Sequence, residues 1–239
     1  MLRNKKILGV IGGMGPYATL TFFEKFLRYN INAKCDQDHF PLYILNDPEI
    51  PDRTRSIIRD ENLDVISNQL INNAQRLQHL GCHSLIMPCN TAHYFYDDIQ
   101  DNIDIPIISL VDETLREINS QHKKSFGLLS TFGTVYTNTY NKSAYDFNIK
   151  IKTPCNDQQD RLSHIIYDIK SHSKPTEIFK EYHRIEIEKI CDEMNKKYNI
   201  NTFVLGCAEF GIIYDDIQHS KYDFIDPMDI VIGNFYNLT

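Results

Sequence analysis

The sequence contains no hydrophobic run long enough to cross a membrane, no linker rich in glycine and serine, and no excess of positive charge. The first apolar run, residues 7–10, is cut short by Gly12, Gly13 and Gly15, which excludes a signal-peptide core and a membrane span. The net charge of −7, from 25 basic and 32 acidic residues, gives no general attraction to nucleic acid or to an anionic membrane. We therefore expect a cytoplasmic globular protein that binds neither.

Closely spaced cysteine pairs are also absent. The six cysteines are scattered along the chain without a C-x-x-C pair, so reduced thiols are expected rather than a disulfide framework. Four of them are expected to be small buried hydrophobic residues: Cys35, Cys82, Cys155 and Cys191.

What the sequence does contain is an alternation of short apolar runs with helical stretches, which is typical of a parallel α/β architecture. Leucine, isoleucine and alanine recur at helical spacing between residues 60 and 80, with Gly81 at the position of a C-terminal cap. Pro175 marks the start of another long helix. The expected strands lie at residues 7–10, 42–45, 85–87, 105–108, 126–129 and 203–205.

The chain also contains an internal repeat. A shift of 118 positions lays residues 5–19, KKILGVIGGMGPYAT, over residues 123–137, KKSFGLLSTFGTVYT. The same shift, without a gap, places Cys89 of SLIMPCNT on Cys207 of TFVLGCAE. We infer two related α/β halves that meet near Lys123 and Lys124, each with a cysteine at the end of a strand.

The position of these two cysteines predicts a shared site, because ligands of open α/β sheets bind at the carboxyl ends of the strands. If the halves face each other, Cys89 and Cys207 point into one cleft from opposite sides. A helix N-terminus and nearby donors favour the thiolate form of such a cysteine. One thiolate can then remove a proton from a carbon while the other thiol returns a proton to the opposite face.

Such inversion requires fixed hydrogen-bond donors for the developing negative charge. Backbone N–H groups at the two glycine turns are candidates, together with the side chains of Asn90, Thr91, Thr131 and Thr134. Glu209 follows the second cysteine as a further polar residue. The anion that the glycine turn Gly13–Ala18 favours at its helix N-terminus is then a substrate carboxylate.

Six motifs are spread over nearly the whole chain: GGMGP (12–16), NDPEIPDRT (46–54), MPCNTAH (87–93), STFGT (130–134), LGCAE (205–209) and IDPMD (225–229). Together, and in this order, they resemble those of the aspartate racemase branch of the aspartate/glutamate racemase superfamily.

The resemblance implies an amino-acid racemase that uses neither pyridoxal phosphate nor a metal, has no cofactor, and often forms a homodimer. It assigns acid and base roles to Cys89 and Cys207 and favours aspartate as the substrate. It adds to the substrate-binding set Met14 in the glycine turn, Arg53 of the PDRT motif, and Ala92, besides Asn90 and Thr91.

The implied fold has two pseudo-symmetric domains, each a parallel sheet flanked by helices, with the active site in the cleft between them. The first domain is expected at residues 1–115 plus 219–239 and the second at 116–218. Two positions depart from the family pattern. Ala208 stands where the family commonly has threonine, and Lys170 is the nearest match to a lysine expected just after a helix that ends near Ile169.

Three alternatives were weighed. An NAD-dependent oxidoreductase would use the Gly13–Ala18 fingerprint with Asp36, but it does not predict a matched cysteine in each half. A non-catalytic amino-acid sensor would keep the cleft, and a racemase of glutamate or of broader specificity would keep the chemistry. A zinc site is less favoured than ordinary helix and strand roles for its five candidate ligands: His79, Cys82, His83, Cys89 and His93.

Overall fold

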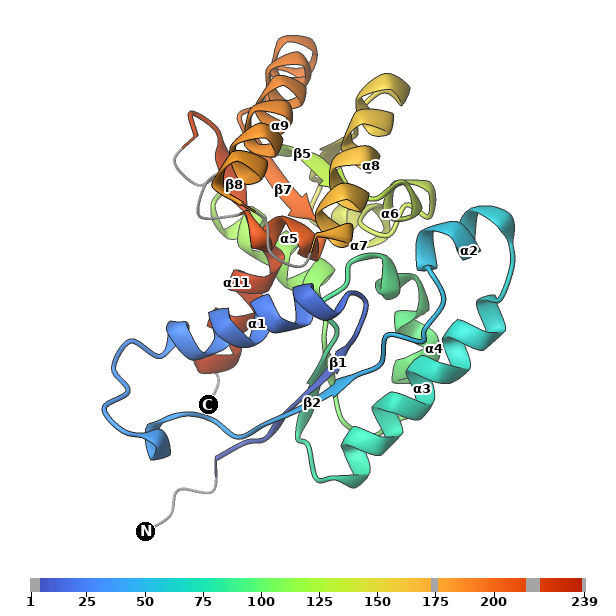
Figure 1. Ribbon diagram of the computed structural model, residues 1–239, viewed down its shortest axis with the longest axis vertical. Helices are drawn as coiled ribbons and strands as arrows, with labels where there is room; N and C mark the ends of the chain where they lie inside the picture. The colour runs from blue at the N-terminus through green and yellow to red at the C-terminus, as the bar shows by residue number, and fades with distance from the viewer. Residues whose placement is uncertain (1–4, 173–175, 214–219, 238–239) are drawn as a thin grey trace.

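The computed structural model describes residues 5–172, 176–213 and 220–237, and it contains two four-stranded parallel sheets. Figure 1 shows the first half of the chain around β1 and β2 and the second half around β5 and β7, with helices on both sides of the strands. The first sheet has the order β2-β1-β3-β4 and the second the matching order β6-β5-β7-β8. The two-part α/β architecture expected from the sequence is therefore confirmed.

The first half consists of strands and helices that alternate along the chain. Its strands are β1 (Leu8–Gly12), β2 (Leu42–Asn46), β3 (Ser84–Ile86) and β4 (Ile107–Ile108). Its helices are α1 (Pro16–Tyr29), η1 (Asp36–Asp38), α2 (Arg53–Arg59), α3 (Leu63–His79), η2 (Thr91–Phe95), α4 (Tyr96–Gln100) and α5 (Leu110–Ser120).

The second half repeats this alternation, and the last helix of the chain follows it. Its strands are β5 (Ser125–Ser130), β6 (Lys150–Lys152), β7 (Thr202–Gly206) and β8 (Asp223–Ile225). Its helices are α6 (Phe132–Tyr136), α7 (Asn141–Asp146), α8 (Asn156–Ser171), α9 (Glu177–Tyr198), η3 (Ala208–Ile212) and, at the end, α11 (Pro227–Asn237).

The register of the strands supports the internal repeat. Gly9 pairs with Leu85 between β1 and β3, and the residues 118 positions later, Gly127 and Phe203, pair between β5 and β7. The two halves therefore share strand order and central register, so residues 118 apart occupy corresponding places in the strands that carry the site.

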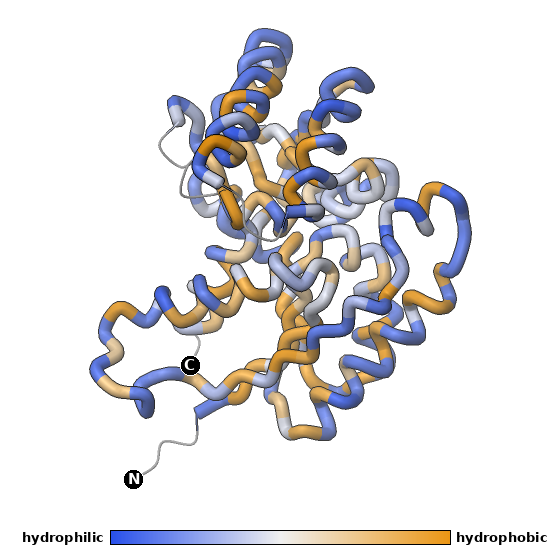
Figure 2. The backbone as a smooth tube through the Cα atoms, viewed as in Figure 1, coloured by the Kyte–Doolittle hydropathy of each residue, from blue (hydrophilic) through white to orange (hydrophobic). Residues whose placement is uncertain are grey.

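Apolar side chains hold a layer of helices on each face of both sheets, and Figure 2 shows these hydrophobic segments along the strands and the inner faces of the helices. In the first sheet, Val10 packs among residues of α1 and α11, while Ile11 packs among residues of α3. In the second, Leu128 lies in a cluster with residues of α5, and Leu129 in a cluster with residues of α8 and α9. Among the described residues, no helix combines the length and apolar composition needed to cross a membrane.

Most of the expected elements are present. The helix expected over 60–80 is α3, and Gly81 follows it with a φ of 86°, as a left-handed cap requires. Pro175 lies outside the described residues, and the helix after it, α9, begins at Glu177. Two short strands, β6 and β8, were not predicted.

All six cysteines are free, but only part of the prediction for the four outside the site is right. Cys82 and Cys191 are buried, whereas Cys35 and Cys155 are exposed. The reason is local: Cys35 and Cys155 are N-cap residues, of η1 and α8, and their thiols face the first turn of the helix instead of a core.

Candidate active site

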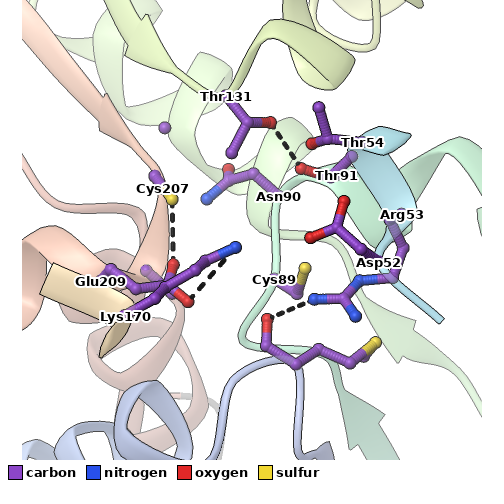
Figure 3. Close-up of a pocket in the computed structure, with 13 residues that line it drawn as sticks. Asp52, Arg53, Thr54, Cys89, Asn90, Thr91, Thr131, Lys170, Cys207 and Glu209 are labelled. Atoms are coloured by element: carbon purple, nitrogen blue, oxygen red, sulfur yellow. Dashed lines mark hydrogen bonds and ion pairs between the residues drawn. The ribbon is translucent and has the colours of Figure 1, made fainter. Parts of the chain in front are cut away.

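Residues from both halves line one small cavity beyond the carboxyl ends of β3 and β7 (Figure 3). Its volume is about 10 Å³, which is room for about one water molecule. The lining residues are Met14, Asp52, Arg53, Thr54, Cys89, Asn90, Thr91, Thr131, Lys170, Gly206, Cys207, Ala208 and Glu209. We call this space the inner cavity.

Cys89 lies in the loop between β3 and η2 and is only 7% exposed. Its backbone is fixed by His93, whose Nδ1 lies 2.9 Å from the Cys89 carbonyl oxygen. The Leu110 N–H donates to Nε2 of the same ring at 3.0 Å, so Nδ1 carries the proton and donates to Cys89. Burial lowers the pKa of His93, which keeps the ring neutral. His93 therefore connects the Cys89 loop to the start of α5.

Three threonine hydroxyls form a cluster beside Cys89. Thr91 Oγ1 lies 2.8 Å from Thr131 Oγ1 and 3.0 Å from Thr134 Oγ1, and the last two lie 3.2 Å apart. Thr91 belongs to the first half and the other two belong to the second. Next to them, Gly133 brings α6 against α2, because a Cβ there would come within 2.9 Å of Thr54 Cα. This cluster joins the two halves at the inner cavity.

Asn90 also reaches across to the second half. The hydroxyl of Tyr140, the residue that precedes α7, donates to Asn90 Oδ1 at 2.5 Å. Both side chains are buried, with exposed fractions of 2% for Asn90 and 1% for Tyr140. Tyr140 does not line the inner cavity itself.

Cys207, at the end of β7, has charged neighbours. Its thiol donates to Glu209 Oε2 at 2.9 Å, and Lys170 Nζ lies 3.8 Å from Glu209 Oε1 (Figure 3). Burial and the Glu209 carboxylate raise the pKa of Cys207 well above its usual value, and Lys170 opposes them only in part. Burial lowers the pKa of Lys170, but the Glu209 carboxylate outweighs that effect and raises it. Cys207 is therefore a thiol and Lys170 an ammonium ion in this arrangement.

Arg53 is the second cation of the inner cavity. It is the first residue of α2 and is 7% exposed. Its guanidinium donates to three backbone carbonyls, those of Met14 at 2.9 Å, Pro51 at 3.1 Å and Ile50 at 3.3 Å. Its Nε has no hydrogen-bond partner among the described residues. A buried guanidinium held by neutral acceptors keeps its positive charge available for an anion.

A shallower groove adjoins the inner cavity. It has a volume of about 230 Å³ and includes Tyr17 and Ile212 in its walls. It shares four charged residues with the inner cavity: Asp52, Arg53, Lys170 and Glu209. These four side chains therefore stand between the inner cavity and the groove.

The structure brings most of the predicted site residues together. Nine of the eleven line the inner cavity: Met14, Arg53, Cys89, Asn90, Thr91, Thr131, Lys170, Cys207 and Glu209. Thr134 touches the site only through the threonine cluster, and Ala92 packs in the apolar core below it. Lys170 lies in the last turn of α8, which runs to Ser171, so the expectation of a lysine after the helix is corrected.

Four lining residues were not predicted: Asp52, Thr54, Gly206 and Ala208. Asp52 caps α2 by accepting from the Arg55 N–H, and the Tyr167 hydroxyl donates to it. The supporting residues His93 and Tyr140 were also missed as parts of the site. His93 stands in the MPCNTAH motif, which was a usable signal, whereas no motif marks Tyr140.

One of the expected donors of the glycine turn, the Gly13 N–H, is already hydrogen-bonded within the turn. A Cβ at Gly13, where φ is 92°, would meet the Asp47 backbone at 2.3 Å, so only glycine fits there. The Gly13 N–H donates to Thr19 Oγ1 at 2.9 Å instead of pointing at a ligand. The turn therefore positions Met14 and Arg53 and does not offer the Gly13 amide to an anion.

A family model described as Asp/Glu/Hydantoin racemase matches residues 11–234. The chain belongs to this racemase family. A broad-specificity amino-acid racemase, RacX, of Bacillus subtilis is 31% identical over 141 residues, which are 57% of this chain and 59% of that protein. A glutamate racemase of Hydrogenobaculum is 22% identical over 72% of this chain and 61% of its own length. The matched regions thus span about three-fifths of these two relatives.

Solved structures of the family resemble the whole fold. An aspartate racemase of Picrophilus torridus has a TM-score of 0.82 and 28% identity, covering 98% of this chain and 94% of its own. An aspartate racemase homologue from Pyrococcus horikoshii has a TM-score of 0.76 at 22% identity, with 98% of both chains covered. The architecture of two parallel sheets is therefore that of the racemase fold.

Proposed function

We propose that the protein interconverts L- and D-aspartate without a cofactor, with Cys89 and Cys207 as the two proton-transfer groups. The observation that carries this proposal is that both thiols line one buried cavity, each from the corresponding strand end of its half. Two groups that act from opposite sides of a carbon are what inversion of that carbon requires. No other cysteine lines the cavity among the described residues.

The proposed reaction has two proton transfers. The thiolate of Cys89 takes the proton from Cα of the amino acid and becomes a thiol, leaving a carbanion with its charge spread over the carboxylate. The thiol of Cys207 then gives its proton to the other face of Cα and becomes a thiolate. The two cysteines have then exchanged protonation states. Reaction of the opposite enantiomer, in the reverse direction, restores the original states.

The charged neighbours support this direction for the form of the protein described here. Burial and Glu209 hold Cys207 as a thiol, which makes it the proton donor. Glu209 accepts the S–H, so it is the acceptor that aligns the hydrogen before substrate enters. Cys89 is then the base. The protein in this protonation state accepts the substrate enantiomer whose Cα proton faces Cys89.

Aspartate suits the charges that line the cavity. Its two carboxylates can pair with Arg53 and Lys170, while its ammonium group can pair with Asp52 or Glu209. Arg53 has the buried, incompletely paired guanidinium that a second carboxylate needs. The aspartate racemase among the similar structures also supports this substrate. The similarity to RacX favours a racemase of broader specificity as the second candidate.

The inner cavity must widen for this reaction, because about 10 Å³ cannot hold an amino acid. The groove beside it supplies the route, since the four shared charged side chains are the groups that substrate would meet first. We therefore propose that substrate enters through the groove and displaces the Lys170–Glu209 ion pair.

A screen of single amino acids in D₂O tests the function. Incubation without added cofactor, read by NMR for Cα deuteration and by chiral chromatography for inversion, should show aspartate as the best substrate. The Cys89→Ala/Cys207→Ala protein is the control and should be silent. Activity should persist with a chelator and with a carbonyl-trapping reagent. Equal turnover of many amino acids would favour the broader specificity, and no turnover of any would refute the proposal.

Two further expectations remain proposals. One is the division of the chain into residues 1–115 plus 219–239 and residues 116–218, which limited proteolysis would test. The other is a homodimer, which light scattering after size-exclusion chromatography would test.

A further inference from the structure

The hydrogen bond between Tyr140 and Asn90 fixes which end of the Asn90 amide faces the inner cavity. The heavy-atom distance of 2.5 Å is too short for an N–H donor and lies at the short end of the range for O–H donors. The atom that meets the Tyr140 hydroxyl is therefore Oδ1, and the hydroxyl donates. This leaves both N–H bonds of Nδ2 for the cavity, and in Figure 3 the Asn90 amide extends toward the Cys207 side.

The environment keeps the hydroxyl in the donor role. Burial raises the pKa of Tyr140, so the phenol stays protonated over the whole working range of pH. A neutral, buried phenol with a fixed ring has one proton to donate, and Asn90 Oδ1 is its hydrogen-bond acceptor. The orientation of the amide is thus set before any ligand arrives.

The internal repeat supplies an independent comparison. The residue 118 positions before Tyr140 is Phe22, and the residue 118 positions after Asn90 is Ala208. Phe22 lies in α1 and belongs to the same apolar cluster as Ala208. At the sequence positions that correspond by the 118-residue shift, the other half therefore has two apolar residues, whereas a polar pair lies beside Cys89.

From this juxtaposition we propose that Tyr140 is a positioning residue, which holds Asn90 so that its Nδ2 donates to the carboxylate of the substrate as charge develops there. The inference rests on the proposed racemase function. It adds to that function a definite donor and the residue that orients it. Tyr140 itself does not touch the substrate, because it does not line the inner cavity.

A double-mutant cycle tests the proposal. Tyr140→Phe should lower kcat/KM for aspartate racemisation about tenfold, mainly through kcat, since the donor matters most when charge has developed. Asn90→Ala should lower it more, and the double variant should equal Asn90→Ala alone, because Tyr140 acts only through Asn90. Tyr145→Phe, at an exposed position of α7, is the matched control and should behave as the parent.

A further variant, Asn90→Asp, tests the N–H donors of Asn90 separately from its oxygen acceptor and leaves Tyr140 unchanged. It keeps an oxygen for the hydroxyl but removes the N–H donors, so it should be as impaired as Asn90→Ala. It also serves if Tyr140→Phe does not fold, which circular dichroism would show. Additive effects in the cycle, or near-parent activity of Asn90→Asp, would overturn the positioning role while leaving a racemase. A parent protein that inverts no amino acid would instead overturn the function, and this inference with it.

Discussion

The two halves present their cysteines in the same backbone frame but with different chemistry around them. Cys89 is followed by Asn90 and Thr91, which bond to neutral hydroxyls of the other half. Cys207 is followed by Ala208 and Glu209, and it lies against a carboxylate and an ammonium group. The strands that lead to the two cysteines pair in the same register, and the residues around the two thiols differ.

The comparison teaches why the two thiols need not be equivalent. A two-base reaction begins with one thiolate and one thiol, and the surroundings of Cys207 favour the thiol. In the proposed reaction, the repeated strand positions would bring the two cysteines into one site, and the residues that differ within the repeat would give them different starting roles. The predictions below test that division of labour.

The largest effect is expected from the cysteines themselves. Cys89→Ala and Cys207→Ala should each lower racemisation by at least about 10³-fold, because inversion cannot finish with one proton-transfer group. Thermal melting should stay close to that of the parent. Cα deuteration separates the two, since only the variant that keeps the base for a given enantiomer can still exchange its proton. A variant with full racemase activity would refute the two-base scheme.

Arg53, which the first half contributes, should determine the preference for a dicarboxylic substrate. Arg53→Ala should cost about 2 kcal/mol of transition-state stabilisation for aspartate, or roughly 30-fold in kcat/KM. Arg53→Lys should cost less, since it keeps the charge but loses the planar fork. Alanine, which has no side-chain carboxylate, should show little change if it is turned over. Unaltered kcat/KM for aspartate would remove Arg53 from substrate recognition.

Glu209 should help to keep Cys207 in its thiol form. Glu209→Gln removes a negative charge beside Cys207, so the pKa of that thiol should fall toward its usual value. Alkylation of Cys207 near neutral pH should then accelerate, because the fraction present as thiolate rises as the pKa falls. Peptide mapping by mass spectrometry, with the exposed Glu61→Gln as control, would measure the rate. An unchanged rate would show that Glu209 does not hold Cys207 as a thiol.

The smallest expected effect concerns His93, which connects the Cys89 loop to the start of α5. Burial lowers the pKa of His93 below its ordinary 6.5, so below that value the unfolded chain binds a proton that the folded protein excludes. The free energy of unfolding should therefore decrease as the pH is lowered below 6.5, by at most about 1.4 kcal/mol per pH unit. Urea unfolding should show a weaker dependence in His93→Asn but not in the exposed His79→Asn. Identical pH dependence in all three proteins would contradict this role.

The sequence predicts the frame of the site well, because the repeat and the motifs are local patterns. The spacing that pairs Cys89 with Cys207 is preserved in strand register, and Arg53 of the PDRT motif lines the inner cavity. The expectation that Lys170 follows the helix was wrong because α8 continues two residues past Ile169, to Ser171.

Contacts between the halves could not be predicted in the same way. Tyr140 and Asn90 are 50 positions apart, and their pairing depends on how the second sheet sits against the first. The contact of Asp52 could not be predicted for the same reason. Its carboxylate accepts a hydrogen bond from the hydroxyl of Tyr167, which lies near the C-terminal end of α8. Similarly, Gly13 was expected to offer its N–H to a ligand, and only the fold shows that Thr19 already accepts it.

The unequal surroundings of the two cysteines have a thermodynamic limit. L- and D-aspartate have equal free energies in water, and both directions pass through the same transition states. Because kcat/KM measures those states against free enzyme and free substrate, it must be the same for the two enantiomers. Glu209 and the threonine cluster can therefore make kcat and KM differ between L and D, but only in step. If the protein racemises aspartate as proposed, it has no preferred direction, however much the surroundings of its two cysteines differ.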